Sequence, residues 1–102
     1  MPPLNDSTSA LLRAIRRKFP KSAHFEVDEI ASRSWASGTF VGTRHAFAFT
    51  VTGPGAAAFL ADLEAAEFDL RGHILADVTL VSHAIDGDAD RIAIEALTVE
   101  DN

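Results

Sequence analysis

Apolar residues recur along this chain first with the period of a helix and then with the period of strands. Between residues 7 and 19 they fall within one arc of about 100°, which predicts an amphipathic helix with a single core-facing stripe. The stripe consists of Leu11, Leu12, Ile15 and Phe19. Pro20 cannot continue a helix and therefore ends this one.

Residues 24–52 carry strand signals. Residues 45–52 place large side chains on odd positions and small ones on even positions. This alternation predicts a strand with one well-filled face, and Gly38 and Gly42 offer turns before it.

A second helix is expected after the strand pattern breaks at residues 52–56, with Pro54 suited to the first helical position. Because the pattern then alternates again, residues 73–84 form the clearest strand of the chain. We expect its core face to carry Ile74, Ala76, Val78 and Leu80.

The last strand is expected over residues 90–99, after a two-residue hairpin turn at Asp86-Gly87. Its inward side chains are expected to be Ile92, Ile94 and Ala96.

The predicted order of elements is α-β-β-α-β-β in a single α+β domain over residues 1–102, with residues 1–6 and 100–102 frayed. Short turns between neighbouring strands give a four-stranded antiparallel sheet with both helices on one face, a two-layer sandwich. The two helix–hairpin halves follow each other with a shift of about 48 residues, which suggests a duplication. That shift pairs Phe47 with Glu95, however, and so reverses the face chosen for the last strand.

A sheet covered by helices on one side leaves its other face to be explained. By alternation this face carries Ala46, Ala48, Thr50, Leu75, Asp77, Thr79, Val81, Ala93, Glu95, Leu97 and Val99. The mixture is too apolar for a plain solvated face and too polar for a core. We therefore expect a homodimer through the sheet, burying ~800 Å² per subunit, with Trp35 near the rim as an anchor.

Composition narrows the class of protein. At 47% hydrophobic and 24% charged residues the chain is an ordinary globular domain, and the absence of cysteine excludes disulfides, thiolate metal sites and cysteine nucleophiles. Without a signal-peptide pattern or an apolar run of about 18 residues, we expect a soluble, cytoplasmic protein. Seven arginines against two lysines, with eighteen alanines, hint at a bacterial, GC-rich genome.

Charge is unevenly spread along the chain. The net charge of −6 argues against nonspecific binding to nucleic acid, which we do not expect as a partner. Residues 7–21 nevertheless hold five bases and no acid, whereas residues 62–102 hold eleven acids and two arginines. A solvated helix face is the simpler interpretation of Arg13, Arg16 and Arg17, and an adaptor surface for a partner is the alternative.

Motifs that could carry chemistry fail on their context. Gly53–Ala58 fits a dinucleotide-binding loop, but the fold that uses it needs several parallel βαβ units. Residues 86–97 imitate the start of a calcium loop, yet arginine and leucine occupy its sixth and twelfth positions. His73 and His83 share a strand face but lie about 33 Å apart, too far to bind one ion. We expect no catalytic residue, no metal and no cofactor.

Three classes of function remain after these exclusions. A self-associating, homodimeric binding module is the leading hypothesis. The second is a small-ligand protein or small dimeric enzyme that uses the open sheet face, with Asp77, His83, Glu95 and Trp35 as candidate groups. The third is a protein or nucleic-acid adaptor that acts through the basic first helix.

Overall fold

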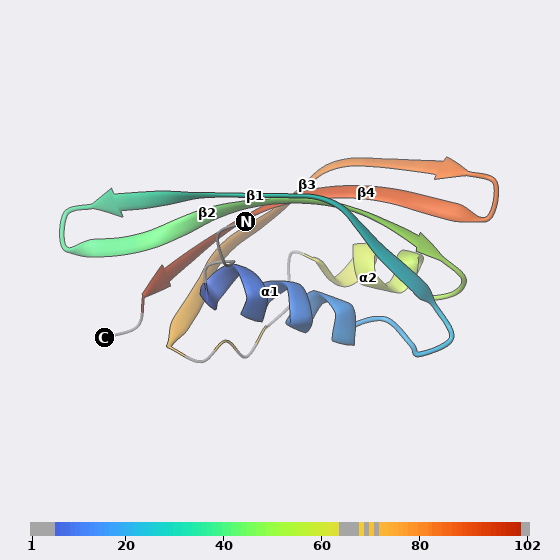
Figure 1. Ribbon diagram of the computed structural model, residues 1–102, viewed down its shortest axis with the longest axis horizontal. Coiled ribbons are helices and arrows are strands. Elements are labelled where there is room, and N and C mark those ends of the chain that lie inside the picture. The colour runs from blue at the N-terminus through green and yellow to red at the C-terminus, as the bar shows by residue number, and fades with distance from the viewer. Residues whose placement is uncertain (1–5, 64–67, 69, 71, 101–102) are drawn as a thin grey trace.

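The structure, a computed structural model, describes residues 6–63, 68, 70 and 72–100. Its elements are α1 (Asp6–Arg17), β1 (His24–Ser37), β2 (Phe40–Thr52), α2 (Ala56–Asp62), β3 (His73–Asp86) and β4 (Ala89–Glu100). Both helices lie against the same face of one antiparallel sheet, so the predicted α+β order and two-layer arrangement are confirmed (Figure 1). Regular structure includes Asp6 and Glu100, one residue further at each end than expected.

The strands lie in the order β1-β2-β4-β3, so β2 and β4 form the centre of the sheet and β1 and β3 its edges. Each hairpin is longer than the helix beside it. The two hairpin tips therefore extend beyond the helices at opposite ends of the molecule (Figure 1).

Both hairpins close with two-residue loops that begin with glycine. Gly38 has φ 60° and Gly87 has φ 65°, and no described residue other than glycine has a positive φ. A positive φ at the first loop position alone is the pattern of a type II′ turn, which matches the twist of the flanking strands. The second loop is therefore Gly87-Asp88 rather than Asp86-Gly87, and Gly42 lies inside β2 instead of in a turn.

The second helix begins two residues later than expected. Its N-cap is Gly55, with φ 113°, and the helix proper starts at Ala56, so Pro54 lies in the preceding turn. A side chain at Gly55 would approach Pro20 Cδ to 2.8 Å. The glycine thus allows the start of α2 to pack against Phe19 and Pro20, which follow α1.

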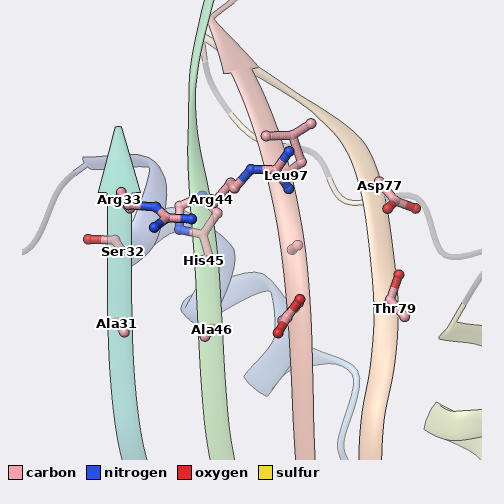
Figure 2. Close-up of a pocket in the computed structure, with 11 residues that line it drawn as sticks. Ala31, Ser32, Arg33, Arg44, His45, Ala46, Asp77, Thr79 and Leu97 are labelled. Carbon is pink, nitrogen blue, oxygen red and sulfur yellow. The ribbon is translucent and has the colours of Figure 1, made fainter. Parts of the chain in front are cut away.

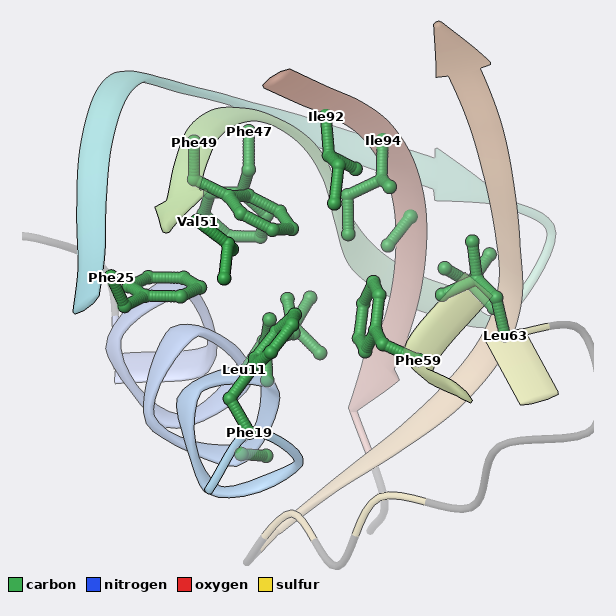
Figure 3. Close-up of a cluster of buried hydrophobic side chains, with 14 of the residues drawn as sticks. Leu11, Phe19, Phe25, Phe47, Phe49, Val51, Phe59, Leu63, Ile92 and Ile94 are labelled. Atoms are coloured by element: carbon green, nitrogen blue, oxygen red, sulfur yellow. The ribbon is translucent and has the colours of Figure 1, made fainter. Parts of the chain in front are cut away.

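The hydrophobic core lies between the two helices and the central strands (Figure 3). The odd positions of β2 and the even positions of β4 face it, as expected. Four phenylalanine rings meet there, with Phe25 stacked on Phe49 and Phe19 tilted against Phe59, each pair at 4.8 Å between ring centroids. Burial of these apolar side chains determines which face of each central strand the helices cover.

Strand β3 contains two β-bulges, which change the side chains that share a face. At the first, pairing with β4 shifts between Leu75 and Asp77, and Ala76 is the extra residue. Because an extra residue reverses the alternation, Leu75 packs against the core whereas Ile74 points away and is 52% exposed. The expectation that Ile74, Ala76 and Val78 share the core face is wrong, as is the placement of Leu75 opposite to it.

The second bulge lies between Leu80 and Ser82. After this bulge the odd positions of β3 face the core again, as they do before the first bulge. His83, which pairs with the core-facing Ile92, therefore lies on the helix side of the sheet. The predicted grouping of His83 with Asp77 on one face is therefore wrong.

A repeat of the helix–hairpin unit is visible in the positions of its elements. His24 and His73 open two strands of 14 residues, 49 residues apart, and the loop glycines are separated by the same distance. A shift of 49 residues matches Phe47 with Ala96, and both of these residues face the core. A shift of about 48 residues instead matches Phe47 with Glu95, which faces the other side of the sheet.

Candidate functional site

The open face is the side of the sheet turned away from α1 and α2, and none of the described helices covers it (Figure 1). It is formed by the even positions of β2, the odd positions of β4 and their partners on the edge strands. Apart from Leu75, the residues expected there are on it: Ala46, Ala48, Thr50, Asp77, Thr79, Val81, Ala93, Glu95, Leu97 and Val99.

Two neighbouring rows of cross-strand partners form the middle of the open face. The charged row runs from β1 to β3 through Arg33, Arg44, Leu97 and Asp77. The alanine row beside it runs through Ala31, Ala46, Glu95 and Thr79. Ala31 and Ala46 have short side chains, which leave space above the sheet. The two rows therefore line an open concavity of 680 Å³ (Figure 2).

Arg33 and Arg44 are direct cross-strand partners on the open face. The side chain of Arg33 extends from β1 over β2, and that of Arg44 extends towards Leu97 on β4 (Figure 2). Neither forms an ion pair with a carboxylate of the described residues. Like charges directly opposite each other destabilise a sheet, so this pair favours an anion that approaches from outside the subunit.

Acidic side chains occupy the other half of the same concavity. Asp77 on β3 and Glu95 on β4 share the open face, as predicted, and are offset from each other by one row. The concavity therefore has a basic side on β1 and β2 and an acidic side on β3 and β4. One surface thus carries both halves of a possible ion-pair network.

Trp35 lies on the open face, one row beyond Arg33, and is half-buried. Its row, which we call the apolar row, continues through Gly42, Val99 and Ile74. Trp35 does not line the concavity; it lies beyond the basic side, on the edge strand β1. The open face is therefore apolar at this end and charged in the middle.

His83, the remaining candidate of the predicted site, is separated from the others. Its Nε2 donates to Asp90 Oδ2 at 2.7 Å on the helix side of the protruding hairpin. The bulge between Leu80 and Ser82 is the cause, because it reverses the face of every residue that follows it.

His45 lies on the core face of β2, beneath the concavity, and is 2% exposed. Its Nδ1 lies 3.1 Å from Thr8 Oγ1 and its Nε2 lies 2.8 Å from Thr98 Oγ1. Burial, with a smaller contribution from the charge of His73, lowers the pKa of His45 from 6.5 to about 4. The imidazole is therefore neutral at physiological pH and joins α1, β2 and β4.

The predicted basic surface of α1 is present. Arg13, Arg16 and Arg17 are exposed and line a second concavity, at the end of α1 and the start of β1. This concavity is remote in the fold from the concavity of the open face, and the two share no lining residue.

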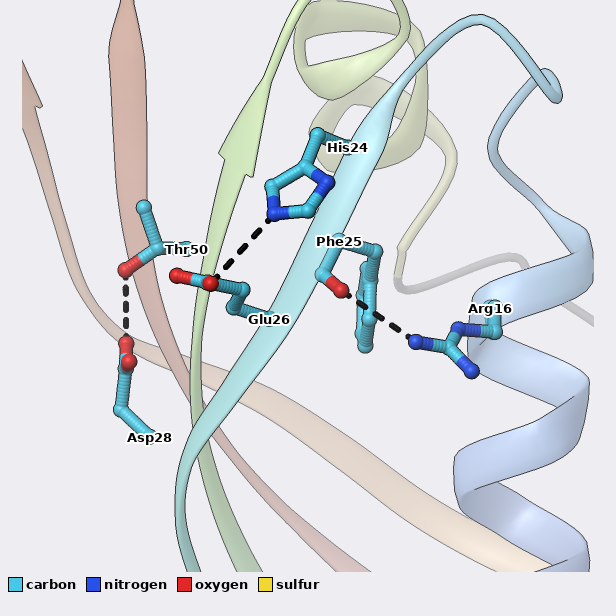
Figure 4. Close-up of polar contacts among 6 residues, drawn as sticks. All are labelled: Arg16, His24, Phe25, Glu26, Asp28 and Thr50. Atoms are coloured by element: carbon cyan, nitrogen blue, oxygen red, sulfur yellow. Dashed lines mark hydrogen bonds and ion pairs between the residues drawn. The ribbon is translucent and has the colours of Figure 1, made fainter.

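Sequence reasoning missed Arg33 and Arg44. Residues 46, 48 and 50 were assigned to the open face by alternation, and Arg44 is the even position that precedes them. The sequence therefore contained a local signal for Arg44. Arg33 had none, because its face depends on a bulge at Asp28 that only the pairing with β2 reveals. Thr50 Oγ1 donates to the carboxylate of Asp28 at 2.6 Å and holds this bulge on the open face (Figure 4).

No three His, Asp or Glu side chains among the described residues are grouped to hold a metal ion. None of the described helices has the length and apolar character needed to cross a bilayer.

Comparison with known proteins adds no relative: no family model, no curated protein and no solved structure matches this chain. The residues of the open face therefore carry the functional argument.

Proposed function

We propose that this protein is a self-associating binding module that forms a homodimer through the open face of its sheet. The observation that supports it best is the charge pattern of that face, which carries a basic and an acidic side within one concavity. A surface of this kind complements a second copy of itself. We place this module in the bacterial cytoplasm, as its composition suggests.

A two-fold axis parallel to the strands, between β2 and β4, gives the dimer a definite geometry. This axis places each row of one subunit over the same row of its partner, with the two rows running in opposite directions. Arg33 of each subunit then faces Asp77 of the partner subunit, so that two such pairs form. In the alanine row the partner's Glu95 faces Ala46, two residues from Arg44 on the same strand. Two sheets packed face to face in this aligned manner are a common arrangement of β-proteins.

Apolar contacts support the same geometry. In the apolar row the axis brings Trp35 over Ile74 of the partner subunit, and Ile74 is 52% exposed in the single chain. Because the bulge at Ala76 turns Ile74 outward, it supplies an apolar side chain where the dimer uses one. Aromatic anchors of this type often dominate the binding energy of an interface.

The area of the face suits a stable dimer. Four strands spaced ~4.8 Å apart and about nine residues of each strand give roughly 600 Å² per subunit in projection. Side-chain relief adds to this area, which approaches the ~800 Å² per partner of specific complexes.

Charge reversal in two complementary variants tests the proposal. Arg33→Glu/Arg44→Glu leaves only acids at the four charged positions, and Asp77→Lys/Glu95→Lys leaves only bases. We expect each variant alone to be monomeric in light scattering after gel filtration at micromolar concentration, and an equimolar mixture to form a heterodimer.

Arg13→Glu/Arg17→Glu is the matched control, since it makes the same charge change on α1, away from the open face. It should remain a dimer. A wild-type protein that is a 10.9 kDa monomer at micromolar concentration would overturn the proposal. If either charge-reversal variant stays dimeric on its own, the open face is not the interface.

A small-molecule site in the same concavity is the second candidate. Its volume of 680 Å³ and its opposed Arg44 and Glu95 favour a small zwitterionic compound. A thermal-shift screen of such compounds against the wild type and Glu95→Gln tests it. Stabilisation of the wild type alone would favour this function over self-association as the role of the face.

A further inference from the structure

A second concavity, of 750 Å³, lies between the end of α1 and the start of β1. We call it the basic groove. Its polar lining is cationic or titratable and includes no carboxylate: Arg13, Arg16, Arg17, Lys21 and His24. Its apolar lining is Phe19, Pro20, Ala23 and Phe25. The groove therefore presents positive charge beside apolar surface.

One guanidinium of the groove is held in place. Arg16 Nη2 donates to the backbone oxygen of Phe25 at 3.2 Å, and its guanidinium carbon lies 5.3 Å from the centroid of the Phe25 ring (Figure 4). These two contacts orient Arg16 at the edge of the sheet, since β1 is an edge strand. The positive charge at this end of the groove is thus pre-organised.

The other cations of the groove are available to a ligand. Arg13, Arg17 and Lys21 are exposed and form no ion pair with a described carboxylate. Glu26, which lies outside the groove lining, contacts His24 at 3.4 Å. The helix dipole accounts for bases in the last turn of α1, but it does not account for Lys21, which follows the helix.

We infer that the basic groove binds an acidic peptide segment of a partner protein in an extended conformation. Arg13 and Arg17 are separated by one helical turn, about 6 Å along the axis. Acidic side chains at alternate positions of an extended chain are about 6.6 Å apart and point to the same side. Two carboxylates of one segment can therefore each meet a guanidinium, while Arg16 extends the same basic surface.

The apolar lining favours a peptide over a nucleic acid. Phe19 and Phe25 are buried and offer no exposed aromatic face on which a base could stack. The chain as a whole carries a net charge of −6, which repels a long polyanion from the surface around the groove. A short acidic segment with an apolar side chain matches the charge and the accessible apolar surface of Pro20 and Ala23.

Binding of a defined peptide tests the inference. The probe is a fluorescein-labelled peptide that alternates aspartate and phenylalanine, and its partner replaces each aspartate with asparagine. By fluorescence anisotropy at low salt, we expect the aspartate peptide to bind at least about tenfold more tightly than the asparagine peptide. Arg13→Glu/Arg17→Glu should abolish this preference, because both carboxylate partners are lost.

The control separates this site from the proposed dimer interface. Arg33→Glu/Arg44→Glu makes the same charge change on the open face and should retain full peptide binding, whatever its oligomeric state. Peptide binding that survives Arg13→Glu/Arg17→Glu, or no binding to the wild type at about 1 mM peptide, would overturn the inference. Tighter binding of duplex DNA or inorganic phosphate than of the aspartate peptide would overturn it too.

Discussion

Acid should destabilise this protein through His45, whose imidazole is enclosed between two threonine hydroxyls. Burial lowers its pKa from 6.5 to about 4, with a smaller contribution from His73. The unfolded chain therefore takes up a proton at a higher pH than the folded protein does. The stability linked to this difference is complete above the unfolded pKa of 6.5 and is lost as the pH falls towards 4.

The size of the effect follows from the difference between the two pKa values. About 2.5 units at 1.36 kcal/mol per unit correspond to a loss of about 3 kcal/mol, of which about 2 kcal/mol is lost by about pH 5. Domains of this size are stable by roughly 5–15 kcal/mol, so one buried imidazole changes a substantial fraction of the total.

Urea unfolding followed by circular dichroism, at a series of pH values from about 4 to 8, measures this loss. His45→Gln is the comparison, since its amide retains a donor and an acceptor but does not titrate. All other titratable groups are common to both proteins and cancel in the difference between their free energies of unfolding. That difference should change by up to about 1.4 kcal/mol per pH unit below about pH 6. A difference that stays constant across this range would refute the role of His45.

Four further substitutions test contacts made with the sheet. Gly42→Ala places a methyl group against the backbone oxygen of Thr98 and should cost about 3 kcal/mol, seen as a fall in Tm of more than about 10 °C. Leu75→Asn should cost about 3 kcal/mol in urea unfolding and Ile74→Asn less than about 1 kcal/mol, because only Leu75 packs on the core; equal costs would contradict the bulge. Arg16→Met retains the stem but loses the bond to the β1 backbone, and should cost about 1 kcal/mol by the same measurement; an unchanged midpoint would show that bond to be unimportant.

The local periods of the chain were enough to predict its architecture. The stripe that contains Leu11 and Ile15 identifies α1, and the alternation through Phe47 and Phe49 identifies the core face of β2. Each of these signals lies within one element, since a helix or a strand repeats its own side-chain direction. The order of the elements and the covered face of both central strands follow from such signals.

The predicted face of each candidate residue on β3 was right only where no bulge intervenes. Asp77 and Glu95 share the open face as expected, because the segment of β3 around Asp77 and Thr79 is regular. Ile74 and His83 lie beyond the bulges on either side, and both face the opposite way from their predicted direction. A bulge has no period of its own, so alternation along one strand does not reveal it.

Local sequence alone determined which segments are helices and strands and how the central strands face the core. Only the tertiary structure decided which side chains meet across strands: Arg33 with Arg44, His45 with Thr8 and Thr98, and Arg16 with Phe25. The physical reason is that secondary structure depends on neighbours a few residues apart, whereas strand register and bulges are set by pairing between segments remote in the chain.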